Sequence, residues 1–132
     1  GASRGNPGIA GIGVALLGEG GNTVKEIAKH IGNVTNNVAE YTALITALRE
    51  TLKMGFTEIE IFADSELMVK QIKGEYKVKN EGLKPLYDEA KTLLQRFEAH
   101  SIGHIRRELN KQADKLANLG IDEELRKSAD GS

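Results

Sequence analysis

Glycine-spaced apolar residues dominate the first part of the chain. Residues 9–17 are Ile-Ala-Gly-Ile-Gly-Val-Ala-Leu-Leu, a composition typical of a β-strand. The run Gly18-Glu19-Gly20-Gly21-Asn22 follows, and glycine and asparagine are residues that tight turns favour. The pattern therefore predicts a hairpin of two antiparallel strands, 9–17 and 23–31.

A helical stripe begins at Val38, where apolar residues recur every three or four positions. Its members are Val38, Tyr41, Leu44, Ile45, Leu48 and Leu52. Thr35 or Asn36 is available as the N-cap, and Gly55 supplies a stop signal. We therefore expect a long helix between these two signals.

A strand and a short helix are predicted next. Ile59 and Ile61 alternate with glutamates, which indicates a strand that ends near Asp64. Ser65 can cap the helix that follows, which carries apolar residues at helical spacing. Those residues are Leu67, Met68, Val69 and Ile72.

The last elements follow a lysine-rich stretch. Pro85 suits the first turn of a helix whose apolar repeat runs to about His100, and 102–107 indicates a further strand. Asn110 can cap a final helix that ends at Gly120. The order β-β-α-β-α-α-β-α predicts an α/β domain on a mixed sheet.

Composition limits the class of protein. The chain has 132 residues, 39% hydrophobic and 28% charged, which predicts one globular domain over 1–132, with 121–132 as a weakly ordered tail. The absence of cysteine excludes thiolate metal sites, leaves oxygen ligands for any metal, and fits a cytoplasmic setting. No apolar run approaches the ~20 residues of a membrane span, so we expect no membrane association. The net charge of −1 means that binding to nucleic acid would need a local basic patch.

Three acids are placed where secondary structure can aim them at one point. Glu40 lies in the first turns of the long helix, Asp64 at a strand end, and Asp114 near the start of the last helix. Carboxylates held in this way can bind two Mg²⁺ ions about 3.5–4 Å apart. Such a pair of ions catalyses the hydrolysis of phosphodiesters. The alternative is that helix N-termini simply favour acids, by ~0.3–1 kcal/mol.

An asparagine accompanies two of these acids. Asn37 precedes Glu40 by three residues, and Asn110 precedes Asp114 by four, so each pair shares a helix face. Amides can contact a sugar hydroxyl or a phosphate oxygen of nucleic acid. Each asparagine is equally an ordinary helix cap, and the pattern leaves both roles open.

Four motifs in order resemble the type 1 ribonuclease H family, and the resemblance covers nearly the whole chain. They are Gly1-Ala2-Ser3-Arg4-Gly5-Asn6-Pro7-Gly8, Thr35-Asn36-Asn37-Val38-Ala39-Glu40-Tyr41, Ala63-Asp64-Ser65 and Arg107-Glu108-Leu109-Asn110-Lys111-Gln112-Ala113-Asp114. The resemblance implies a five-stranded mixed sheet of order 3-2-1-4-5, flanked by helices. Because the pattern yields four strands, we expect the first strand to be missing or truncated.

By this resemblance, the chain is an endoribonuclease that uses two Mg²⁺ or Mn²⁺ ions and no small-molecule cofactor. Its metal-binding and catalytic acids are Glu40, Asp64 and Asp114, and Arg107 is the assisting cation. Its contacts to nucleic acid are Asn6, Thr35, Asn36, Asn37, Ser65 and Asn110. The implied partner is an RNA–DNA hybrid, cut by a monomeric protein to 5′-phosphate and 3′-hydroxyl ends.

The family's fourth acid, an aspartate, would stand immediately before Gly1. We expect a longer native chain that supplies it. Without it, the alternative is a catalytically impaired module of the same fold that binds the hybrid but does not cut it. An integrase-like strand transferase shares the fold, but the motifs fit it less well.

Two basic features remain open. His104 precedes Asp114 by ten residues, the spacing of a loop histidine that some family members use, but its surroundings favour a strand histidine. A group of lysines can line a groove for the DNA strand or form a solvated face. These lysines are Lys70, Lys73, Lys77, Lys79 and Lys84.

Overall fold

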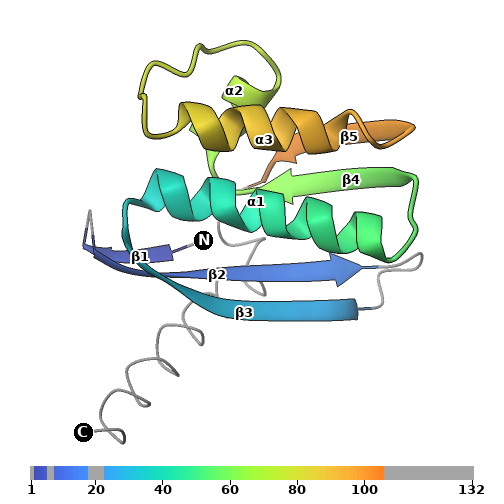
Figure 1. Cartoon of the computed structure of the whole chain (residues 1–132), viewed down its shortest axis with the longest axis horizontal. Helices are drawn as coiled ribbons and strands as arrows, with labels where there is room; N and C mark the ends of the chain where they lie inside the picture. Colours follow the sequence, from blue (N-terminus) through green and yellow to red (C-terminus); the bar gives the residue numbers. More distant parts are fainter. Residues whose placement is uncertain (1, 6–7, 18–22, 106–132) are drawn as a thin grey trace, which may run out of the picture. The chain divides into compact units, whose positions relative to one another are not determined.

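The structure, a computed structural model, describes residues 2–5, 8–17 and 23–105 (Figure 1). Contacts divide the chain into two compact units. The first unit comprises Gly1–Ala39 and Lys111–Ser132, and the second comprises Glu40–Asn110. Each unit is described by itself below.

The first unit holds an antiparallel sheet of order β1-β2-β3. Its strands are β1 (Ala2–Gly5), β2 (Gly8–Leu17) and β3 (Thr23–Val34). The predicted hairpin is confirmed, and β3 continues to Val34 instead of ending at residue 31. On β2, the buried side chains Ala10, Ile12 and Val14 alternate along the strand, as expected for a sheet with one covered face.

The strand β1 bears on the expectation that the first strand is missing or truncated: a first strand of four residues is present, so it is not missing. Ala2 pairs with Gly11 and Gly5 with Gly8, in an antiparallel ladder. The described residues therefore contain five strands, and the prediction of four is wrong. The segment Ala-Ser-Arg-Gly has neither alternation nor β-branched residues, so its pairing depends on β2 and leaves no signal in its own sequence.

The part of the second unit that the structure describes contains a parallel pair of strands and three helices. In chain order they are α1 (Asn36–Lys53, whose first residues belong to the first unit), β4 (Glu58–Ala63), α2 (Glu66–Ile72), α3 (Lys84–Leu94) and β5 (Ala99–His104). β4 pairs with β5 from Glu58↔Ala99 to Ala63↔His104. The two sheets supply the neighbours 3-2-1 and 4-5 of the expected strand order.

The end of α3 differs from the prediction. The helix was expected to continue to about His100, but it ends at Leu94, and β5 begins at Ala99 instead of Ile102. The backbone N–H of Glu98 donates to the carbonyl of Thr57 at 2.8 Å, which starts the pairing of β5 with β4. Phe97, which continues the apolar repeat, is buried in the turn after the helix. The pairing of β5 with β4 thus ends the helix before its apolar repeat ends.

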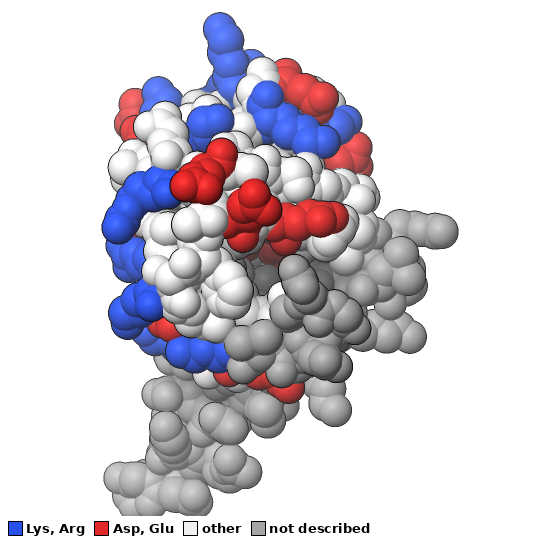
Figure 2. Space-filling model, turned by 90° about the vertical axis from the view of Figure 1, so that its right-hand side faces the viewer, with Lys and Arg blue, Asp and Glu red and all other residues white. Residues whose placement is uncertain are grey.

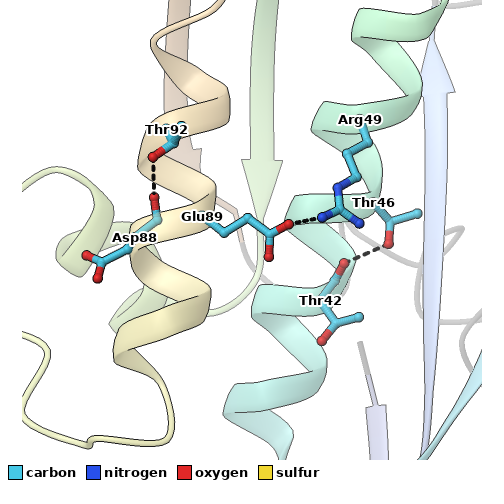
Figure 3. A network of polar contacts seen from close by, with 6 residues as sticks. All are labelled: Thr42, Thr46, Arg49, Asp88, Glu89 and Thr92. Carbon is cyan, nitrogen blue, oxygen red and sulfur yellow. Dashed lines mark hydrogen bonds and ion pairs between the residues drawn. The ribbon is translucent and has the colours of Figure 1, made fainter.

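The helices α1 and α3 lie side by side, joined by an ion pair between Arg49 and Glu89 (Figure 3). The hydroxyl of Thr46 donates to the carbonyl of Thr42 at 2.8 Å, so this polar group is satisfied within α1. Leu44, Ile45 and Leu48 of α1 are buried, while Arg49 is exposed. Within the described residues, no helix has the length and apolar character that a membrane crossing requires.

Gly55 ends α1 with a left-handed backbone, φ 86°, and its N–H donates to the carbonyl of Leu52 at 3.0 Å. Because a side chain in this conformation costs about 1–2 kcal/mol, we expect Gly55→Ala to lower the free energy of unfolding by about that amount. Urea denaturation measures this change. Gly103→Ala is the matched control, since its added Cβ would meet the Phe62 ring at an ordinary 3.8 Å. Equal effects of both substitutions would contradict the assignment.

Candidate functional site

Asp64 lies at the carboxyl end of β4, held by structure on both sides. Before it, the carbonyl of Ala63 accepts from the N–H of Ile105 at 2.9 Å. After it, Ser65 caps α2, because its Oγ accepts from the N–H of Met68 at 3.2 Å. The half-buried Asp64 is therefore fixed between a paired strand and a capped helix. The predicted cap is confirmed, while contact of Ser65 with nucleic acid stays a prediction.

The start of α1 carries Thr35, Asn36, Asn37 and Glu40. Thr35 is the cap: its Oγ1 accepts from the N–H of Val38 at 3.3 Å, and its carbonyl accepts from the N–H of Ala39 at 3.0 Å. Asn36 is therefore the first helical residue and not the cap. Asn36 and Asn37 are exposed, and Glu40 is half-buried.

The turn of α1 that carries Glu40 is tied to α2. The hydroxyl of Tyr41 donates to Oε1 of Gln71 at 2.6 Å, in a buried contact. The relative exposure is 1% for Tyr41 and 5% for Gln71. Burial, together with the neighbouring Tyr87 on α3, raises the pKa of Tyr41 to about 12. Tyr41 thus joins α1 to the helix that begins two residues after Asp64.

Glu40 and Asp64 have the chemistry of ligands for a hard divalent cation. Both are half-buried carboxylates, and both belong to the second unit. Oxygen ligands of this kind suit Mg²⁺ and Mn²⁺. Within the described residues, no group of three or more His, Cys, Asp or Glu is placed to hold a metal. The donor types fit the predicted metal, and the third predicted ligand, Asp114, lies outside the described residues.

Four predicted site residues lie outside the residues that the structure describes. They are Asn6, Arg107, Asn110 and Asp114. His104 is described: it is the last residue of β5, opposite Ala63, so the interpretation as a strand histidine is confirmed. The hydrogen bond from Lys70 and its charge lower the pKa of Glu66, and the exposed His104 adds a smaller contribution in the same direction.

The predicted lysine group divides in two. Lys70 is engaged locally: its Nζ lies 2.9 Å from the carboxylate of Glu66 and donates to the hydroxyl of Tyr76 at 3.3 Å. The same ammonium lies 5.0 Å from the centre of the Tyr76 ring. The other members, Lys73, Lys77, Lys79 and Lys84, are exposed on the segment from the end of α2 to the start of α3. These four lysines are therefore more available to a ligand than Lys70.

An acidic face occurs where β4 and β5 begin. Figure 2 looks toward this end and shows acidic side chains gathered near the middle of the face. Glu58 and Glu60 line a shallow depression of about 360 Å³ together with His100 and Ser101. Asp64 lies at the other end of β4. Because these carboxylates repel phosphates, the depression is unsuited to nucleic acid.

Comparison with known proteins decides the family. A family model described as reverse transcriptase-like matches residues 1–120. Ribonuclease H of Pseudomonas savastanoi is 34% identical over an alignment that covers 93% of this chain and 89% of that protein. The chain belongs to the ribonuclease H family. The resemblance inferred from the motifs is confirmed.

Other ribonuclease H relatives are more similar in sequence but longer. Ribonuclease HI of Halobacterium salinarum is 43% identical over 93% of this chain. A bifunctional protein of Mycobacterium tuberculosis is 42% identical over 92% of this chain. The chain spans 62% of the length of the first protein and 34% of the second.

Solved ribonuclease H structures confirm the fold class. RNase H1 from the halophilic archaeon Halobacterium salinarum superposes with a TM-score of 0.90 at 43% identity and covers 92% of both chains. LC11-RNase H1, solved in complex with an RNA/DNA hybrid, superposes with a TM-score of 0.89 at 44% identity and covers 94% of both chains. The expected α/β ribonuclease H-like fold is therefore correct.

The link between Tyr41 and Gln71 escaped the sequence analysis. Tyr41 belongs to the apolar stripe of the helix, and its hydroxyl adds no separate signal to that pattern. Gln71 lies between Val69 and Ile72 on α2, and both of these apolar residues are buried. A polar residue amid the buried positions of a short helix was the available signal, because buried polar groups need partners.

Ionisation of Tyr41 should destabilise the fold. Its pKa is raised from 10.0 to about 12 in the folded chain, so its contribution to the free energy of unfolding is fully present below about pH 10 and is lost as pH rises to about 12. Urea unfolding across this pH range measures the loss. Tyr41→Phe should remove this component, and the same alkaline slope in both proteins would argue against it.

Proposed function

We propose that the chain is a metal-dependent ribonuclease H that hydrolyses the RNA strand of RNA–DNA hybrids. The observation that carries the proposal is the placement of Asp64 at the fixed junction of β4 and α2, with Glu40 on a helix tied to α2. Family membership supports the activity. The hybrid bound by LC11-RNase H1, a protein 44% identical to this chain, supports the choice of substrate.

Glu40 and Asp64 would hold the divalent cations, with Asp114 as the third ligand proposed from sequence. Two Mg²⁺ or Mn²⁺ ions held there would supply activation of water and stabilisation of charge on the leaving oxygen. A water molecule would add to the phosphorus and give up a proton, while the bond from phosphorus to O3′ breaks and O3′ takes up a proton. The products are a 5′-phosphate and a 3′-hydroxyl. Arg107 is the proposed assisting cation.

Asn36 and Asn37 are suited to recognise the sugar of the RNA strand. Both are exposed in the first turn of α1, just after the cap at Thr35. An amide both donates and accepts hydrogen bonds, as the 2′-hydroxyl does, and this hydroxyl distinguishes RNA from DNA. The selectivity for RNA is therefore assigned to this end of α1.

Cleavage of a labelled RNA–DNA hybrid in Mg²⁺ tests the function. We expect cutting of the RNA strand alone, with 5′-phosphate ends. Asp64→Asn should lower the rate by at least about 100-fold, because loss of even an outer-shell partner can cost 10- to 100-fold. Asp88→Asn, at an exposed acid of α3, is the matched control. Binding of the hybrid without cutting would instead favour the impaired module.

The exposed lysines between α2 and α3 should contribute to binding the hybrid. We expect Lys77→Gln with Lys79→Gln to raise KM while kcat is nearly unchanged, because contacts with phosphate position the duplex. The slope of the logarithm of the binding constant against the logarithm of the salt concentration should become shallower by about one for each lost phosphate contact. Lys53→Gln, at an exposed lysine of α1, is the control. An unchanged salt dependence in the double variant would show that these lysines form only a solvated face.

A further inference from the structure

A buried hydrogen bond fixes the helix that carries Glu40. Tyr41 is 1% exposed, and its hydroxyl donates to Gln71 at 2.6 Å. Successive helical residues point about 100° apart, so the direction of the Tyr41 side chain determines that of Glu40. Rotation of this part of α1 would therefore break the hydrogen bond and change the direction of the Glu40 side chain.

The acceptor lies on a helix that is held at both ends. At the N-terminal end of α2, Ser65 caps the N–H of Met68. At the C-terminal end, Nζ of Lys91 on α3 donates to the carbonyl of Ile72 at 3.1 Å. Gln71 follows Asp64 by seven residues, about two helical turns. A short, capped helix thus connects the acceptor of the Tyr41 hydroxyl to the position of Asp64.

We propose that Tyr41 and Gln71 are a positioning pair that sets the spacing between Glu40 and Asp64. Both side chains are buried, so they act through the acids and not as catalytic groups. A buried hydrogen bond is directional, so it selects one arrangement of α1 and α2, whereas apolar contacts alone permit small sliding and rotation. Carboxylates that share a cation must be placed to a fraction of an ångström. The inference rests on the proposed function, because it assumes that these acids bind metal.

Three variants separate positioning from general stability. Tyr41→Phe removes the donor and keeps the ring, and Gln71→Leu removes the acceptor. Arg49→Gln is the matched control, because it breaks the tie from α1 to Glu89 on α3, about nine residues from Glu40. The affinity for Mn²⁺ is measured by electron paramagnetic resonance. The Mg²⁺ concentration that gives half-maximal cleavage of the hybrid is measured in parallel, at a temperature where circular dichroism shows every variant folded.

We expect Tyr41→Phe and Gln71→Leu each to weaken Mn²⁺ binding about tenfold and to raise the half-maximal Mg²⁺ concentration similarly. The double variant should bind Mn²⁺ no more weakly than the single variant with the lower affinity, because both changes remove the same interaction. Arg49→Gln should leave both quantities within about twofold of the parent protein. Saturating Mg²⁺ should restore most of the cleavage rate of Tyr41→Phe.

Unchanged Mn²⁺ affinity in folded Tyr41→Phe would overturn the proposal, as would an equal loss in Arg49→Gln. The Mn²⁺ measurement also separates this proposal from the proposed function. If the parent protein binds Mn²⁺ but cuts no hybrid, the activity fails while the variants still decide the positioning role. If the parent protein does not bind Mn²⁺, the positioning role fails as well.

Discussion

Parallel pairing of β4 with β5 is the constraint on which the candidate site depends. Parallel strands require a crossover, here made by α2 and α3, so the chain must leave β4 at one edge and return to the opposite edge. Asp64 directly follows the last residue of β4, where the crossover begins. The carboxyl ends of both strands, Ala63 and His104, meet at the same edge of the sheet. A loop, a helix cap and a carboxylate are therefore concentrated where the crossover begins.

Local signals accounted for most of the fold. The period of α1, its stop at Gly55 and the cap at Ser65 each depend on residues a few positions apart, and the structure agrees with all three. Two predictions failed, the number of strands and the end of α3, and each failure involves a backbone pairing that the residue pattern does not reveal. The strand β1 forms through its pairing with β2, and α3 ends early because the backbone of Glu98 joins the carbonyl of Thr57. Neither partner can be identified from periodicity.

The candidate site divides in the same way. Glu40 and Asp64 could be placed on a helix start and a strand end, because each follows its own cap or alternation signal. The hydrogen bond that links their elements joins Tyr41 to Gln71 across 30 positions, and no local pattern predicts it. Asp114 and Arg107 lie outside the described residues, so for them the motifs alone carry the assignment.

The acidic depression at the start of β4 shows that charge is locally uneven in the second unit, although the net charge of the whole chain is only −1. In Figure 1 the segment between α2 and α3 lies to the left, whereas β4 and β5 begin on the right. The segment 73–84 carries four lysines against two glutamates, whereas Glu58 and Glu60 line the depression, so basic and acidic side chains are unevenly divided between these two places. A polyanion would be attracted toward these lysines and repelled from the depression before any contact forms. This preference weakens as salt shortens the screening length.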